Sequence, residues 1–289
     1  MLSPQGLRIN SREIADSDIG GILDLFARGY PYRAREYWVK AFDLLAKHPT
    51  PPGLPKYGYA MECDGAIVGV MLLIFTKLQT ENGSVIRCAF GGWCVDPEFR
   101  SHAPLLALKA LKHKEATYIS VPGPEIRSIV EAQGFKQYCR GQFIGVPILT
   151  RGSIAQVRIV EAGTDPGAPF EPYERDLLLA HAGYGCLSLW CVTAERAHPF
   201  VFDPLNVRGF IPCARLIYCR SIDEVVRFAR PLGWHLLRRG RPLMVLDANG
   251  PIPAMAGKYF DDSRPKYFKG PVPPRLGDMA YTHFAMFER

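Results

Sequence analysis

The sequence predicts an α/β (α+β) protein of two domains, each a mixed, mostly antiparallel central sheet flanked by helices. Three observations lead to this fold class. The length of 289 residues suits two domains of ordinary size. Strand-like and helix-like periodicities alternate along both halves of the chain. Short motifs of the first half return in the second half at a nearly constant offset.

The first half opens with an alternating strand at residues 9–14. Asp16, Ser17 and Asp18 then offer a cap and first-turn acids to a helix that carries an apolar stripe from residue 19. A second apolar stripe predicts a helix over residues 37–47, and the proline-rich residues 50–55 predict a loop.

A hairpin follows, because residues 57–63 and 67–78 are strand-like and Asp64-Gly65 between them is a strong hairpin turn signal. The next strand covers residues 84–95, where Gly91-Gly92 indicates a bulge or a close approach of the backbone by a ligand. The half then closes with helices at 104–114 and 125–133, the second ended by Gly134, and strands at 117–121 and 143–148.

The second half follows a segment rich in Gly and Pro, residues 151–172, which we expect to be a connection. Ser221 and Glu224 match a capping box and open a helix that runs to about residue 239. The remaining expected elements are a helix at 174–182 and strands at 186–192, 199–202, 214–218, 243–247 and 280–287.

A faint internal repeat relates the halves. Tyr57-Gly58 returns as Tyr184-Gly185 at an offset of 127, and the spacing from Cys88 to Cys94 returns from Cys213 to Cys219 at an offset of 125. The repeat predicts a first domain at residues 1–149, a connection at 150–172 and a second, degenerate copy at 173–289.

The first half resembles the GNAT acyltransferase superfamily, which transfers acyl groups from coenzyme A, and the resemblance covers about residues 6–147. Four stretches carry it in order: Arg12 to Ile19 as the opening strand and helix, Asp64-Gly65 to Val70 as the hairpin, Cys94-Val-Asp-Pro-Glu-Phe-Arg100 as the end of the fourth strand, and Ile126 to Gly134-Phe135 as the penultimate helix. The resemblance implies a tandem GNAT-like protein whose second copy has no matching loop.

The resemblance also implies the residues that would hold a coenzyme A thioester as cosubstrate. They follow the fourth strand, where the family's loop and helix N-terminus bind the pyrophosphate. In this sequence they are Cys94, Val95, Arg100, Ser101, His102, Ala103 and Leu105. The sequence departs from the family pattern here, because Ala103 and Leu105 replace glycines and Pro104 has no N–H to donate.

No catalytic residue is identified from the sequence. The family's penultimate helix often carries a tyrosine as general acid, and Val130 stands at that position. Asp96, just past the fourth strand, is equally a candidate base and a candidate turn residue, and Glu62 is an example of a base that could act through water from elsewhere. Cys94 is expected to be a packed thiol, because no partner base is identifiable.

Charge and cysteine usage narrow the remaining classes. The net charge of +7 is divided as +3 and +4 between residues 1–147 and 148–289, so nothing indicates a nucleic-acid partner. Eight cysteines include no C-x-x-C pair, so we expect reduced core thiols and no metal. The sequence shows no signal peptide and no apolar run long enough for a membrane span, which predicts a cytoplasmic protein. We expect a monomer or a homodimer.

Two alternatives to an acyl-CoA acyltransferase with an unknown small-molecule or peptide acceptor stay open. A catalytically inactive GNAT-like module would bind a ligand or a partner, and the altered phosphate loop favours it. A relative of the two-domain aminoacyl- or peptidyl-transferring proteins of this fold would use an acyl donor other than coenzyme A.

Overall fold

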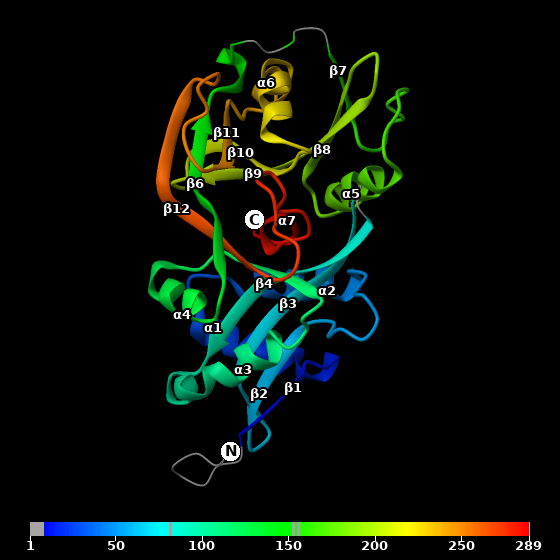
Figure 1. The fold of residues 1–289 in the computed structure, drawn as a ribbon. Helices are drawn as coiled ribbons and strands as arrows, with labels where there is room; N and C mark the ends of the chain where they lie inside the picture. Colours follow the sequence, from blue (N-terminus) through cyan, green and yellow to red (C-terminus); the bar gives the residue numbers. More distant parts are fainter. Residues whose placement is uncertain (1–8, 81–82, 152–153, 155–156, 289) are drawn as a thin grey trace. The chain divides into compact units, whose positions relative to one another are not determined.

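The computed structural model describes residues 9–80, 83–151, 154 and 157–288. They form two compact units (Figure 1). The first holds the described residues up to Ser120 together with Lys269–Val272, and the second holds Val121–Phe268 and the described part of Pro273–Arg289.

The first unit is a five-stranded sheet in the order β1-β2-β3-β4-β5. Pairing is antiparallel except between β4 and β5, which run parallel. Its elements are β1 (Ile9–Glu13), α1 (Ile19–Gly29), α2 (Arg35–Lys47), β2 (Gly58–Cys63), β3 (Ala66–Thr80), β4 (Gly83–Val95), α3 (Ala103–Ala110) and β5 (Ala116–Ser120).

Helices cover both faces of this sheet. Gly92 of β4 lies against Trp38 and Phe26, so α1 and α2 pack on one face. Gly69 of β3 lies against Leu106 of α3, which packs on the other face (Figure 1). The apolar stripes of α1 and α2 are buried as the sequence predicts, which fixes the orientation of both helices.

The second unit is a sheet in the order β12-β6-β11-β10-β9-β8-β7, with one parallel pair, β10 and β11. A core of buried apolar side chains fills the space between this sheet and α6. The elements are α4 (Arg127–Ala132), β6 (Lys136–Gly145), β7 (Arg158–Glu161), α5 (Pro172–Gly183), β8 (Leu187–Val192), β9 (Ala197–Val207), β10 (Ile211–Tyr218), α6 (Ile222–Leu237), β11 (Leu243–Ala248), β12 (Gly257–Lys269) and α7 (His283–Met286).

The two units repeat one order of elements. Each has a strand, helical segment, three antiparallel strands, a helix and a parallel strand. In both units the first strand of the parallel pair carries a bulge. In β4 the bulge is at Gly91, where the register skips from Gly92 to Phe90, and in β10 it is at Ile217. The fold class predicted from the sequence is therefore confirmed, and so is the predicted bulge.

The compact units do not follow the limits of the predicted sequence copies. The strand β6 pairs with β11 and β12, so residues of the first half belong to the sheet of the second unit. The boundaries 1–149, 150–172 and 173–289 describe the sequence repeat and stay a prediction. Of these ranges, residues 1–8, 81, 82, 152, 153, 155, 156 and 289 lie outside the described residues.

One predicted element was wrong, one differs in its bounds, and one contains a strand that the sequence did not predict. The expected closing strand at 280–287 contains the helix α7, and the last strand is β12. The sequence hides β12 because Asp262 and Arg264 interrupt it with positive φ angles at a break in register. The expected strand at 143–148 starts earlier, as β6, and ends before Pro147. The expected connection at 151–172 contains β7, a short and mostly exposed edge strand.

Substitution of Gly58, at the start of β2, tests how closely β2 packs on β3 in the first sheet. Its φ is +116°, and an added Cβ would overlap the carbonyl oxygen of Met71. Gly58→Ala should therefore lower the free energy of unfolding by at least about 3 kcal/mol, measured by urea denaturation.

Gly65→Ala is the matched control for this substitution. Gly65 has a φ of +84° in the hairpin turn, and nothing lies within 4 Å of an added Cβ. We expect a loss of about 1–2 kcal/mol from the backbone conformation alone. Equal losses at both positions would contradict the close packing of β2 on β3.

Candidate functional site

The seven residues expected to hold coenzyme A lie in one continuous segment of the first unit. Cys94 and Val95 end β4, residues 97–102 form a 3-10 helix, and Ala103 begins α3. Side chains alternate on the strand, so Cys94 faces α1 while Val95 faces α3. Arg100 is exposed, and the Ser101 hydroxyl lies 3.1 Å from Nδ1 of His102.

The edge of β4 is the main feature of this segment. Pairing between β4 and β5 ends at Ala89 and Ile119, and β5 ends one residue later. The strand β4 continues for six residues, from Phe90 to Val95, all of intermediate exposure. Among the described residues of the first unit, no strand pairs with this edge. The two parallel strands therefore part, and backbone groups of β4 remain available to a ligand.

The loop after β4 offers fewer backbone donors than its position suggests. The N–H of Phe99 donates to the carbonyl of Asp96, at 2.9 Å, and the N–H of Ala103 donates to the carbonyl of Arg100. Pro104 has no N–H. An anion at this helix start would therefore meet the side chains of Arg100 and His102 more than backbone amides. Within the described part of the chain, Arg100 forms no ion pair.

The two carboxylates that the sequence offered as candidate bases are held in ion pairs. Asp96 lies 2.8 Å from Nη2 of Arg28, and Glu62 lies 2.9 Å from Nε of Arg12. The hydrogen bond to Asp96 raises the pKa of Arg28. Neither carboxylate is positioned as a free proton acceptor.

Cys94 is a packed thiol, as the sequence predicts. Its Sγ lies 3.9 Å from the carbonyl oxygen of Leu25 and contacts Gly29. Burial raises the pKa of this thiol, which favours the unreactive protonated form. All eight cysteines are free thiols.

The second unit has the same parted strands, but its own chain fills the gap. Pairing between β10 and β11 ends at Arg215 and Val245, and β10 continues to Tyr218. Residues 277–279 pair with this edge: Cys219 N–H donates to the Gly277 carbonyl at 2.9 Å, and Met279 N–H donates to the Ile217 carbonyl at 2.8 Å.

The arginine that follows β10 is also engaged. Nε of Arg220 donates to Glu174 at 2.6 Å, and a second bond joins Nη2 to the other carboxylate oxygen. Glu174 is fully buried, so this bidentate pair holds Arg220 inside the unit. The second unit therefore lacks both features of the first: the open strand edge and the exposed arginine.

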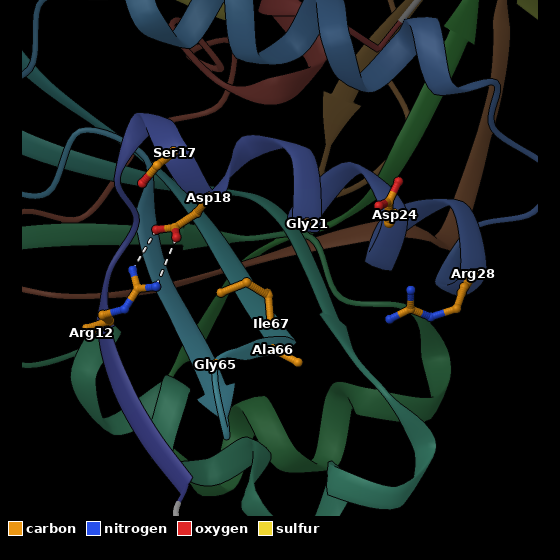
Figure 2. A pocket seen from close by; sticks show the side chains of 9 residues that line it. All are labelled: Arg12, Ser17, Asp18, Gly21, Asp24, Arg28, Gly65, Ala66 and Ile67. Atoms are coloured by element: carbon orange, nitrogen blue, oxygen red, sulfur yellow. Dashed lines mark hydrogen bonds and ion pairs between the residues drawn. The ribbon is translucent and has the colours of Figure 1, made fainter.

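A groove in the first unit, lined by nine residues of α1, β1 and the β2–β3 hairpin, has a volume of about 370 Å³ (Figure 2). Its charged side chains pair with one another or with neighbours, as Arg12 does with Asp18 at 2.6 Å and Asp24 with Arg35 at 2.6 Å. The groove therefore presents balanced charge and no cluster of catalytic groups.

No three His, Cys, Asp or Glu side chains in the described ranges come together as ligands for a metal ion. Of the helices that the structure describes, none is long and apolar enough to cross a membrane.

Comparison with solved structures shows the fold. A candidate acetyltransferase from Pyrococcus horikoshii matches with a TM-score of 0.59 at 13% identity, over 99% of this chain and 98% of its own. GCN5-related N-acetyltransferases from Kribbella flavida and Anabaena variabilis match with TM-scores of 0.58 and 0.59 at 12% and 10% identity. They align over 92% and 90% of this chain, and each over 72% of its own length.

The chain thus has the GNAT fold, and the resemblance inferred from the sequence is confirmed at the level of fold. The solved neighbours are named as N-acetyltransferases, in agreement with the expectation of an acyltransferase. No family model matches the sequence, and no curated protein matches it significantly.

The sequence did not predict two features: one at the candidate site of the first unit and one at the corresponding edge of the second unit. The hydroxyl of Tyr30 donates to the Trp93 carbonyl on β4 at 2.6 Å, across 63 residues. The C-terminal residues 277–279 act as a strand beside β10. No motif announces either one, although the Tyr-rich stretch at 30–37 between two helices was a visible signal.

Glu288 anchors the C-terminal segment in the second unit. Its carboxylate lies 3.0 Å from Nη1 of Arg215 and 3.5 Å from Nη1 of Arg264. Burial alone would raise the pKa of Glu288, but the positive charges of His283, Arg215 and Arg264 outweigh it, and the pKa is lowered.

Glu288→Gln should therefore reduce the free energy of unfolding at pH 7 by about 2–3 kcal/mol. A lowered native pKa stabilises the fold above the ordinary pKa of a glutamate, and this contribution is lost as the pH falls through the native value. The difference between wild type and variant, followed by thermal unfolding from pH 7 to pH 3, should shrink toward acid.

Glu161→Gln provides the control. Glu161 pairs with Arg239 at 2.7 Å, but its side chain is 64% exposed. This change should cost less than about 1 kcal/mol. A difference for Glu288→Gln that stays constant down to pH 3 would contradict the ion-pair anchor.

Proposed function

We propose that the first unit binds an acyl-CoA, acetyl-CoA or a longer one, and transfers its acyl group to an amine or hydroxyl acceptor. The single observation that carries this proposal is the open edge of β4 from Phe90 to Val95. The corresponding edge in the second unit is filled by the chain itself, so the proposal assigns binding to the first unit alone.

The residues present fit coenzyme A in two places. Its long amide-bearing arm can hydrogen-bond with the unpaired backbone of β4, as an added strand would. Its phosphates can meet Arg100 and His102 at the start of α3, where the helix dipole also favours an anion. The loop fits less well than a glycine-rich one, because the Ala103 N–H is already bonded within the loop.

The chemistry we propose is direct attack of the acceptor on the thioester carbon. The C–S bond breaks, the new C–N or C–O bond forms, and the thiolate leaves with a proton supplied by solvent or by the acceptor. Outward-facing N–H groups of β4 would polarise the acyl carbonyl. A cytoplasmic location remains a prediction.

The alternative is a catalytically inactive GNAT-like module that binds a ligand or a partner. The ion pairs of Asp96 and Glu62 favour this alternative, because neither of these two carboxylates is then free to accept a proton. Ligand binding without turnover against a panel of amines and alcohols would support this alternative.

Isothermal titration of the full chain with coenzyme A and with acetyl-CoA tests the proposal. We expect binding that weakens as salt increases, because phosphates and Arg100 attract each other. Arg100→Ala should weaken binding about tenfold or more, and Ala103→Glu should weaken it similarly by adding a negative charge at the helix start.

Arg35→Ala is the matched control, since Arg35 is a half-exposed arginine of the same unit that pairs with Asp24. It should leave the affinity within about twofold. A folded sample that binds neither compound would overturn the proposal.

A further inference from the structure

Tyr30 places a hydroxyl on the open edge of β4 from outside the strand. It directly follows α1, and its OH donates to the backbone carbonyl of Trp93 at 2.6 Å. Both residues belong to the first unit. No other side chain of the described residues donates a hydrogen bond to the backbone of β4 between Gly91 and Val95.

The phase of the β3–β4 ladder shows which groups of β4 face outward. Asp96 N–H donates to the Val68 carbonyl at 2.8 Å, so this opposed pair is a hydrogen-bonded one. Antiparallel pairs alternate, which makes Trp93 and Val95 the residues whose N–H and C=O point away from β3. The open edge therefore carries, in order, the N–H and C=O of Trp93 and the N–H and C=O of Val95.

Tyr30 occupies the acceptor that lies between the two outward N–H groups of this series. Between the two N–H groups the Trp93 carbonyl already has its partner, so the stretch offers hydrogen-bond donors to an incoming ligand. The second unit shows the contrast: there the outward carbonyl of Ile217 accepts an N–H from an inserted chain segment. A peptide strand that paired with β4 at Trp93 would have to share the Trp93 carbonyl with the Tyr30 hydroxyl or displace that hydroxyl.

The ring of Tyr30 is held in place by three aromatic neighbours. Its centroid lies 5.7 Å from Phe26, 5.3 Å from Trp38 and 5.9 Å from Tyr32. Burial raises the pKa of Tyr30 to about 12, so the hydroxyl keeps its proton at neutral pH and acts as a donor.

We propose that Tyr30 is a positioning residue that gives the edge of β4 its preference for an acyl carbonyl. A thioester carbonyl only accepts hydrogen bonds, so it matches two neighbouring N–H groups whose intervening carbonyl is already bonded to Tyr30. Without Tyr30, the freed Trp93 carbonyl would attract water or an amide N–H to the place of the acyl group. This inference rests on the proposed function, and it predicts selectivity for acyl-CoA over the free thiol.

Tyr30→Phe tests this by binding alone, with no need to know the acceptor. The ring and its packing remain, and only the hydroxyl is lost. The ratio of the Kd for coenzyme A to the Kd for acetyl-CoA, by calorimetry, should fall about three- to tenfold. The Kd for coenzyme A itself should stay within about twofold, since no phosphate contact changes.

Tyr32→Phe is the control. Tyr32 contacts Tyr30 edge-on, and it is 75% exposed. This variant should leave the ratio unchanged, and thermal unfolding should confirm that both variants fold.

A second measurement needs no variant. S-ethyl coenzyme A, which has no carbonyl, should bind wild type like coenzyme A and more weakly than acetyl-CoA.

The outcomes separate the two proposals. Wild type that binds neither coenzyme A nor acetyl-CoA contradicts the proposed function, and the role of Tyr30 falls with it. If the wild-type protein binds coenzyme A but binds acetyl-CoA no more tightly than coenzyme A or S-ethyl coenzyme A, only the role of Tyr30 is overturned. An unchanged preference in folded Tyr30→Phe overturns it as well.

Discussion

The architecture of both units depends on how a parallel strand pair ends. The strand β4 extends beyond the end of β5, and β10 extends beyond its pairing with β11. In these extensions, backbone donors and acceptors have no partner from the parallel neighbour. Buried polar backbone groups must find other partners, from water, a ligand or another part of the chain. The two units meet the same requirement differently, and this difference distinguishes a candidate binding edge from a structural one.

Each solution has side-chain consequences. In the second unit the inserted residues 277–279 are accompanied by ion pairs of low exposure, Arg215 with Asp203 at 2.6 Å and Lys266 with Asp247 at 2.6 Å. Such pairs tolerate little rearrangement, because removing one partner leaves a buried charge uncompensated. In the first unit the corresponding strand keeps intermediate exposure and small residues at its bulge, Gly91 and Gly92.

Most of the fold could be predicted from the sequence because its strongest signals are local. The apolar stripes predicted α1 and α2, and Asp64-Gly65 predicted the hairpin turn. Ser221 was predicted as the cap of α6, and in the structure its hydroxyl accepts a hydrogen bond from the Glu224 N–H at 3.2 Å. The errors came from long-range pairing. The first eight residues of β12 are mostly exposed and the strand is interrupted, so only its pairing in the sheet makes it a strand. The candidate site followed the same rule: the segment from Cys94 to Leu105 was visible in the sequence, but the hydrogen bond from Tyr30 to Trp93 was not, because packing alone brings them together.

The placement of β6 has a consequence for how this chain is made. The strand leaves the ribosome soon after the first unit, yet its neighbour β11 begins about a hundred residues later. At a synthesis rate of about 5–20 residues per second, β6 waits roughly 5–20 s with both edges unpaired. Its apolar residues, Phe143 among them, are exposed to aggregation for that time. The yield of folded protein during synthesis should therefore depend on how long β6 stays unpaired.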